Sequence, residues 1–337
     1  MRIVVTGASG NLGSALLRRL RTLGHEVVGV SRRRPAGDPP WAELDLSDPA
    51  CRERLSETFT GADAVVHLAW KLLPAHDEAR LRLTNVIGAD HVLTAAAAAQ
   101  VPHLLVVSSV GAYSPGPKDR TVEEDWPTDG VGASVYARHK AAVERLLDRF
   151  EVDHPQTVLT RVRPGLVFQA AAAGEIARLF LGPLVPTGLI GRVRPPVVPL
   201  PAELVFQAVH ADDVAGAIST LLNARAGGAF NVAADPPLHP SDLARSLGGR
   251  RTARLPLGVL RALAAATWRL RLQPTEPGWI DLAASVPLMS TRRLRELGWE
   301  PEHSSLDALG ELLASMRARD GDPRFPPLHP GRTNVSR

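Results

Sequence analysis

Cysteine is almost absent from this 337-residue chain, and so are long runs of apolar residues or of charges of one sign. The single Cys51 excludes an intramolecular disulfide and a zinc site built from several thiolates. It fits a reducing, cytoplasmic setting. No apolar run reaches the ~18 residues that a membrane-spanning helix needs. The start of the sequence does not resemble a signal peptide, so we expect a cytoplasmic protein without a membrane partner.

The charge balance gives little reason to expect a nucleic-acid partner. There are 39 basic and 35 acidic residues, with a net charge of +4, and the densest basic block is the short run 32–34. Basic residues are therefore not gathered into the kind of surface that nucleic acids require. His210 lies near Asp212 and Asp213, but these three residues do not form a defined metal-ligand pattern, and no metal is expected. The remaining class of partner is a small molecule.

Short apolar strands alternate with helical segments over the first half of the chain. Apolar strands separated by helices indicate βαβ units and a parallel sheet covered on both faces. The sequence therefore predicts an α/β protein with a Rossmann-type doubly wound parallel sheet. The predicted strands are residues 3–6, 26–30, 64–68, 104–108 and 158–163, and the predicted helices are 12–23, 77–100 and 134–150.

The pattern loosens in the second half. Residues 182–201 are rich in proline and glycine and are predicted to be a loop. Helical stretches are expected near 240–247, 256–270 and 291–297. We expect a Rossmann domain mainly in 1–165, a smaller C-terminal substrate-binding region mainly in 166–320, and a loosely held tail at 321–337. Some segments of the second region are expected to return to the first domain.

A glycine-rich turn follows the first predicted strand and precedes the first helix. Gly7 permits a tight turn, Gly10 lets the backbone approach a pyrophosphate, and Gly13 allows close packing of helix and strand. The start of the helix then presents free N–H groups and a positive dipole end. A glycine turn without a ligand is the alternative, but the strand–turn–helix context favours a dinucleotide.

The residues after the second strand bear on the choice of dinucleotide. NAD-binding proteins usually place a carboxylate there for the ribose hydroxyls. Here Ser31, Arg32 and Arg33 follow the strand, and they favour NADP(H), with NAD(H) possible. A solvated basic loop is the alternative. Asp45, after a further short strand, is a candidate acceptor for the adenine amino group, or else part of a helix cap.

Tyr136 and Lys140 lie four residues apart in a predicted helix, and this spacing places both on one face. A nearby ammonium group favours the phenolate, so this tyrosine can exchange a proton with a reacting hydroxyl or carbonyl. Ser109 ends a strand where ligands of parallel sheets bind, and its hydroxyl can stabilise charge on the reacting oxygen. Ser108 is the second candidate for that role. These three residues, Ser109, Tyr136 and Lys140, form the predicted catalytic set.

Together these motifs resemble the extended short-chain dehydrogenase/reductase superfamily, the branch of NAD-dependent epimerases and dehydratases. The resemblance covers nearly the whole chain and implies NAD(P) bound along the C-terminal edge of the sheet, and homodimers formed through the helices near 77–100 and 134–150. The motifs that carry it are Thr6-Gly7-x-x-Gly10-x-x-Gly13, His67-Leu68-Ala69, Asn85, Ser109, Tyr136-x-x-x-Lys140, Arg163-Pro164-Gly165, Val209-His210-Ala211-Asp212-Asp213, Phe230-Asn231-Val232 and Leu297-Gly298-Trp299-x-Pro301. The candidate cofactor-binding residues are Gly7, Ser9, Gly10, Asn11, Leu12, Gly13, Ser31, Arg32, Arg33, Asp45, Leu46, Leu68, Ala69, Tyr136, Lys140, Pro164 and Gly165.

Departures from the family pattern reduce the number of reaction types that we expect for this chain. Nucleotide-sugar dehydratases carry an acidic pair where this chain has Val110 and Gly111, and sugar epimerases usually carry asparagine where it has Leu166. The segment 195–206 is largely apolar, and Trp70 is expected to face the substrate. We therefore expect hydride transfer between nicotinamide and a carbonyl or secondary alcohol on a hydrophobic skeleton. An epimerase acting on a nucleotide sugar, and a non-catalytic NADP(H)-binding regulator, are the alternatives.

Overall fold

The computed structural model describes residues 1–35, 39–72, 76–180, 187–190, 192–274, 276–318, 321–322 and 324–328. Within them the chain forms a seven-stranded parallel sheet in the order β11-β7-β5-β4-β1-β2-β3. The order reverses between β1 and β4, which makes this sheet doubly wound as the sequence predicts. The strands are β1 (Arg2–Thr6), β2 (Glu26–Ser31), β3 (Trp41–Glu43), β4 (Ala64–His67), β5 (His103–Val107), β7 (Val158–Pro164) and β11 (Gly228–Val232).

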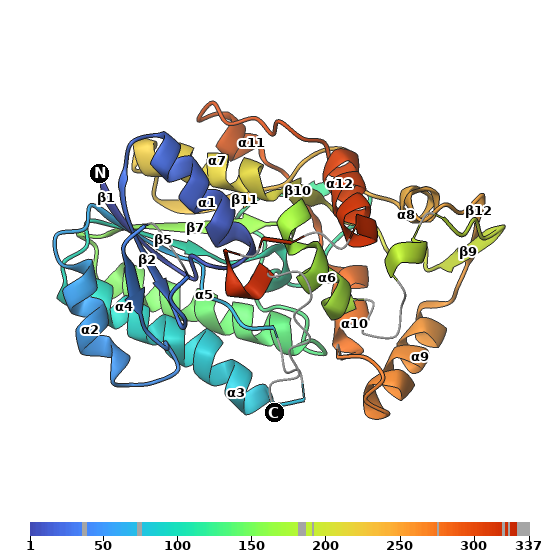
Figure 1. Ribbon diagram of the computed structural model, residues 1–337, viewed down its shortest axis with the longest axis horizontal. Helices are drawn as coiled ribbons and strands as arrows, with labels where there is room; N and C mark the ends of the chain where they lie inside the picture. The colour runs from blue at the N-terminus through green and yellow to red at the C-terminus, as the bar shows by residue number, and fades with distance from the viewer. Residues whose placement is uncertain are drawn as a thin grey trace.

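Helices cover both faces of the sheet, because the strand side chains are apolar on both sides. One face packs against α1 (Asn11–Thr22) and α7 (Ala211–Ala224). The other face packs against α2 (Cys51–Phe59), α4 (Gly88–Ala98) and α5 (Val135–Asp153). Figure 1 shows these two helical layers above and below the strands.

The helix expected over 77–100 contains a wide turn. It is divided into α3 (Glu78–Arg82), a π-helical turn over Leu83–Ile87, and α4. Asn85 lies in the π-helical turn, where its Oδ1 accepts a hydrogen bond from Lys71 N (2.7 Å) and its Nδ2 donates to Lys71 O (2.8 Å). This pair of bonds ties the segment after β4 to the helix. The segment is helical without a break over 78–98, close to the predicted 77–100, but apolar spacing did not reveal that one of its turns is wide.

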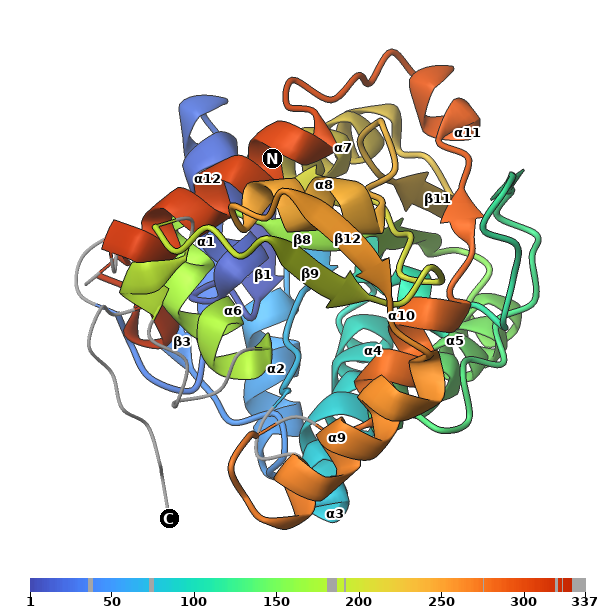
Figure 2. The same cartoon turned by 90° about the vertical axis from the view of Figure 1, so that its right-hand side faces the viewer.

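A smaller lobe lies beside the carboxyl ends of the strands (Figures 1 and 2). It contains two short parallel sheets, and a third short pair joins it to the loop after β5. The elements of this half are β6 (Thr121–Val122), β8 (Leu166–Phe168), β9 (Val197–Leu200), β10 (Ala208–His210), β12 (Arg251–Arg254), β13 (Leu288–Met289), α6 (Ala173–Phe180), α8 (Pro240–Ser246), α9 (Leu257–Arg269), α10 (Gly278–Ser285), α11 (Arg292–Arg295) and α12 (Ser305–Ala318).

Two expectations for this half were wrong. The segment 182–201, expected to be a loop, contains β9, which pairs with β12. Pro199 is tolerated in β9 because β9 is an edge strand of a two-stranded sheet. The tail is not loose where it is described: Leu328 is 3% exposed and belongs to the apolar cluster of α6 and α12. Residues 181–186, 191 and 329–337 lie outside the described residues. No described helix has the length and apolarity to cross a bilayer.

Candidate active site

The residues singled out in the sequence meet at one edge of the main sheet. The strands are parallel, so their carboxyl ends lie together. The reversal of strand order between β1 and β4 makes a crevice at this edge, which is where open α/β sheets bind ligands. The segments that end there are the glycine turn after β1, Ser31–Arg33 at the end of β2, Leu68 and Ala69 after β4, Ser109 after β5, and Pro164 and Gly165 at the end of β7.

The glycine turn has no room for side chains. Gly7 has a φ of +70°, and a Cβ there would lie 2.6 Å from the backbone N and Cα of Ala69. A Cβ on Gly13 would lie 2.4 Å from Gly7 O. Within the described residues, no side chain caps α1 and its first turn contains no acidic residue. The free N–H groups and the positive end of α1 therefore fit the pyrophosphate of a dinucleotide.

A contact that the sequence did not reveal anchors this turn to the smaller lobe. Asn11 Nδ2 donates a hydrogen bond to Val167 O (3.1 Å), and the buried Gln169 donates from Nε2 to Asn11 Oδ1 (2.8 Å). The Asn11 side chain therefore contacts β8 and the residue that follows it. The sequence does not predict this contact, because positions 11 and 169 are far apart and no motif links these two polar residues.

The segment after β2 is arranged by its own hydrogen bonds. Ser31 is buried, and its hydroxyl donates to Arg33 O (2.7 Å), so it shapes the loop that carries the two arginines. Arg32 and Arg33 are exposed. Asp45 Oδ1 accepts from the N (2.9 Å) and the Oγ (2.7 Å) of Ser47, and Leu46 is buried beside it. A turn-capping role for Asp45 is therefore present in this structure.

The predicted catalytic set lies at the start of α5 and the end of β5. Ser134 caps α5 by accepting from Ala137 N (3.4 Å). Lys140 Nζ donates to Val107 O (3.1 Å) and lies 5.8 Å from the centre of the Tyr136 ring. The Ser109 hydroxyl accepts from Gly111 N (3.0 Å) and hydrogen-bonds the Tyr136 phenol. Ser109, Tyr136 and Lys140 are thus brought together.

Burial controls the ionisation of this set. It raises the pKa of Tyr136 to about 12, against the opposing effect of the Ser109 hydrogen bond. It lowers the pKa of Lys140 to about 7, against the opposing charge of Glu144. The phenol is therefore protonated at neutral pH and can give a proton to a developing alkoxide.

Gly111 is a further residue that the site requires. A Cβ at this position would lie 2.7 Å from Tyr136 Cε1, so the ring packs directly against the glycine backbone. The sequence analysis used Gly111 only as a position where nucleotide-sugar dehydratases carry an acidic residue. Its contact with Tyr136 depends on how the turn after β5 faces α5, which no local pattern reveals.

Ser108, the second candidate for the hydroxyl role, belongs to a different environment. It lies near Glu144, whose pKa is lowered: burial is the largest single effect and raises it, and the hydrogen bonds and charge of Arg163 oppose that effect. Glu144 is fully buried, and both of its oxygens accept from Arg163, at 2.9 and 3.0 Å. Arg163 also donates to the Tyr113 hydroxyl (3.0 Å). Ser108 Oγ is buried with no hydrogen-bond partner among the described residues, near the ion pair of Glu144 and Arg163, whereas Ser109 is the serine beside Tyr136.

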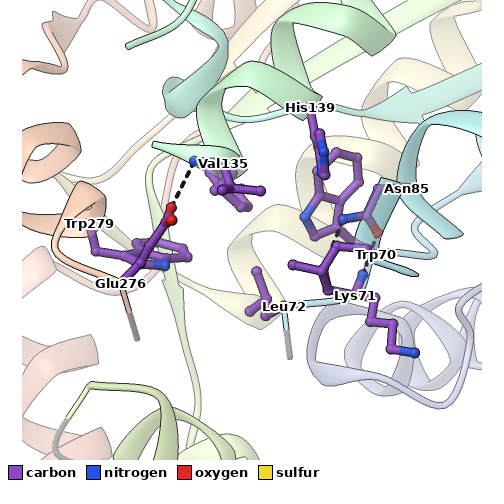
Figure 3. A pocket seen from close by; sticks show the side chains of 10 residues that line it. Trp70, Lys71, Leu72, Asn85, Val135, His139, Glu276 and Trp279 are labelled. Atoms are coloured by element: carbon purple, nitrogen blue, oxygen red, sulfur yellow. Dashed lines mark hydrogen bonds between the residues drawn. The ribbon is translucent and has the colours of Figure 1, made fainter. Parts of the chain in front are cut away.

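A pocket opens over Tyr136 between the sheet edge and the smaller lobe (Figure 3). Trp70 meets Tyr136 edge-on, with ring centres 5.7 Å apart, and its ring also lies 3.6 Å from Lys140 Nζ. Trp279 covers the other side of Tyr136 at 4.9 Å. The pocket is mostly apolar and aromatic, as expected for a site that takes a hydrophobic substrate. Its lining residues are Trp70, Lys71, Leu72, Leu81, Asn85, Val135, Tyr136, His139, Glu276 and Trp279.

The acidic residues near His210 have structural roles. His210 Nδ1 accepts from Asp212 N (3.2 Å) at the start of α7. Both carboxylate oxygens of Asp213 accept backbone hydrogen bonds, from Glu302 N (2.8 Å) and His303 N (3.1 Å). In the described part of the chain, no group of three or more His, Cys, Asp or Glu residues is placed to hold a metal ion.

Known proteins share both the sequence pattern and the fold. Residues 3–233 match the model of the NAD dependent epimerase/dehydratase family. The chain is 29% identical to a 3-diazoavenalumate denitrifying reductase of a Streptomyces species over 338 residues, which cover 92% of this chain and 99% of that protein. It is 28% identical to an uncharacterized protein of Mycobacterium tuberculosis over 329 residues, which cover 95% of this chain. This match spans only 31% of the length of the mycobacterial protein.

Solved structures show the same fold. The dTDP-glucose 4,6-dehydratase of Streptomyces venezuelae, with NAD and TYD bound, superposes with a TM-score of 0.70 at 20% identity. The match covers 98% of this chain and 100% of that one. The doubly wound α/β fold with a smaller C-terminal part is thereby confirmed.

Proposed function

Because the chain belongs to the NAD-dependent epimerase/dehydratase family, whose members use NAD(P), we propose that it is an NAD(P)-dependent reductase of a carbonyl group on an apolar substrate. The observation that carries this proposal is the position of the Tyr136 phenol, which lies beside Ser109 and lines a pocket together with Trp70 and Trp279. The 3-diazoavenalumate denitrifying reductase that the chain resembles over nearly its whole length supports reduction as the reaction class.

Each residue of the set has a defined task in this reaction. Bound nicotinamide supplies the hydride. Ser109 and Tyr136 both hydrogen-bond the carbonyl oxygen, which stabilises its developing negative charge. Tyr136 gives its proton to that oxygen, and Lys140 favours the resulting phenolate by its charge. Trp70 and Trp279 exclude water and hold the apolar skeleton over Tyr136.

NADP(H) is the proposed cofactor form, because Arg32 and Arg33 are exposed at the end of β2, where a ribose phosphate would lie. We expect NADPH to bind about tenfold or more tightly than NADH in a fluorescence titration. Arg32→Ala combined with Arg33→Ala should remove most of this preference, while Arg54→Ala, an exposed arginine on α2, should leave it unchanged. A preference for NADH in the wild type would contradict the assignment.

The direct test of the proposed reaction is NADPH oxidation with a panel of aryl and alicyclic ketones. Turnover that depends on Tyr136 supports reduction. An epimerase acting on a nucleotide sugar is the second candidate, because the family includes epimerases. It would retain NAD⁺ through purification and would epimerise UDP- or dTDP-sugars without net NADPH consumption. Binding of cofactor with neither activity would favour a non-catalytic regulator.

We also propose a homodimer formed by the outer surfaces of α4 and α5. A groove between them is lined by Val86, Ile87, Ala142 and Leu146, with charged residues at its rim. Val86 is already buried in the single chain, so two such surfaces packed together would bury the half-buried Ile87, Ala142 and Leu146. Light scattering should give twice the monomer mass, and Leu146→Asp should give a monomer. A monomeric wild type would contradict the proposal.

A further inference from the structure

Among the residues that line the pocket, one is acidic. Glu276 comes from the segment before α10, on the smaller lobe, and its Oε1 accepts a hydrogen bond from Val135 N (2.7 Å). Val135 is the first residue of α5 and the neighbour of Tyr136. Figure 3 shows the carboxylate reaching across the pocket toward Val135. This hydrogen bond holds the Glu276 carboxylate beside the backbone of the residue that precedes Tyr136, the proposed proton donor.

The surroundings of this carboxylate are largely apolar. Burial raises its pKa, and the Val135 N–H and the charge of Arg138 oppose that effect while Glu78 and Asp281 add to it. The nearby charges are already paired: Arg138 donates to both oxygens of Glu78, at 2.9 and 2.8 Å, and Arg261 donates to both oxygens of Asp281, at 2.9 and 2.8 Å. Within the described residues, neither Arg138 nor Arg261 forms a salt bridge with Glu276.

One hydrogen bond does not satisfy a carboxylate. An ionised carboxylate can accept about four hydrogen bonds, and a partly buried one is costly unless they are made. Among the described residues, Val135 N is the one hydrogen-bond donor to Glu276. The carboxylate lone pairs that Val135 N leaves free can accept from an O–H or N–H group of a ligand, whereas an ether oxygen at the same place would face a carboxylate oxygen and be repelled.

We propose that Glu276 is a specificity-determining residue that accepts a hydrogen bond from a hydroxyl or N–H group of an aromatic, apolar ketone. The inference takes the proposed ketone reduction as its premise and adds the substrate class. The aromatic part of the ligand lies between Trp70 and Trp279. Its carbonyl reaches Tyr136, and its donor group reaches the second oxygen of Glu276.

The test compares two bicyclic ketones that differ only in the donor, 6-hydroxy-1-tetralone and 6-methoxy-1-tetralone. Isothermal titration calorimetry on the full chain in the presence of NADP⁺ gives both Kd values. We expect the wild type to bind the hydroxy ketone about tenfold more tightly, because a hydrogen bond to a charged acceptor is worth about 1.5 kcal/mol or more.

Glu276→Gln should abolish or invert this preference. Its amide oxygen can keep the bond from Val135 N, and its NH₂ group then donates into the pocket and suits the ether. Glu302→Gln, the same substitution at an exposed position outside the pocket lining, is the matched control and should keep the wild-type preference. Equal Kd values in the wild type, binding of neither ketone, or an unchanged preference in Glu276→Gln would each overturn the inference.

NADPH oxidation by the same ketones is measured separately, so the two proposals can fail independently. Selective binding without oxidation of NADPH would refute the proposed reduction and support the role of Glu276 in ligand choice. Oxidation of NADPH with both ketones at equal kcat/KM, unchanged in Glu276→Gln, would support the reduction and overturn the role of Glu276.

Discussion

At the scale of single residues, the two tyrosines of the chain offer a matched comparison. Tyr136 borders the pocket, whereas Tyr113 is fully buried, donates to Asn231 Oδ1 (2.7 Å) and accepts from Arg163. Tyr136→Phe removes the proposed proton donor. We expect kcat for ketone reduction to fall by about 10²- to 10⁴-fold, with NADPH affinity and thermal stability nearly unchanged.

Tyr113→Phe should have the opposite effect. It leaves buried polar partners unsatisfied, so we expect the free energy of unfolding to fall by about 1–3 kcal/mol while kcat of the folded enzyme stays within a few-fold of the wild type. Urea unfolding and steady-state kinetics on both variants separate the two roles. Full activity in Tyr136→Phe would contradict the catalytic assignment.

Gly111 gives a second prediction at this scale. In Gly111→Ala the new Cβ would lie 2.7 Å from Tyr136 Cε1, so the ring must shift relative to Ser109. We expect kcat to fall by about 10- to 100-fold, since a displacement of about 1 Å at a catalytic group has effects of that size. Gly132→Ala is the control, because a Cβ there meets nothing within 4 Å and its kinetics should match the wild type.

The residues of the site divide by how they could be recognised. Ser109, Tyr136 and Lys140 were predicted because a strand end and a helical spacing are local signals, and the structure brings them together. Gly111 and Glu276 contact the same tyrosine or its neighbour from other segments. Glu276 is 140 positions away from Tyr136, so only the folded chain reveals its place in the pocket.

At the scale of secondary-structure elements, the glycine turn and α1 act as one unit. A Cβ at Gly13 would lie 2.4 Å from Gly7 O and 2.6 Å from the carbonyl group of Ala8, which forces α1 away from the turn. Gly13→Ala should therefore weaken NADPH binding by about tenfold or more, measured by fluorescence titration. Gly310→Ala is the control: Gly310 lies in α12, where a Cβ meets nothing within 4 Å, and the substitution should leave cofactor affinity unchanged. Equal affinities of Gly13→Ala and the wild type would refute the assignment of this turn to the cofactor.

The elements themselves were predicted unevenly, for physical reasons. The buried parallel strands are continuous apolar runs, which makes β1, β4 and β5 easy to recognise. β9 was taken for a loop because prolines lie within and around its apolar residues, and an edge strand of a two-stranded sheet tolerates proline. The π-helical turn at Leu83–Ile87 was missed because the apolar residues on both sides of it continue a helical pattern.

At the scale of the whole molecule, the alternation of strands and helices predicted the doubly wound sheet. The same pattern did not predict how the elements of the second half pack against one another. α12 packs against α6 and β10 through Leu309, Leu312 and Met316, and no helix was predicted over its residues. Such contacts depend on segments more than 100 residues apart. Sequence periodicity says which face of a helix is apolar and leaves its partner undetermined.

The whole molecule also holds two histidines in a neutral state. Burial, assisted by the charge of Lys140, lowers the pKa of His67 to about 3, and its Nδ1 lies 2.6 Å from Thr6 Oγ1. Burial, assisted by Arg225, lowers the pKa of His103 to about 4, and its Nε2 lies 2.8 Å from Thr160 Oγ1. An unfolded chain protonates both near pH 6.5, so between pH 6.5 and 4 the unfolded state binds more protons than the folded state.

Stability must therefore fall as the pH is lowered through this range, by up to ~1.4 kcal/mol per pH unit for each histidine. Urea unfolding between pH 7.5 and 4.5 should show the decline. His103→Gln keeps a partner for Thr160 and cannot be protonated, so it should reduce the slope by about 1 kcal/mol per pH unit. His239→Ser, an exposed position at the start of α8 where serine can also cap, should leave the slope as in the wild type. If His103→Gln and the wild type lose stability equally on acidification, His103 is not held neutral by the fold.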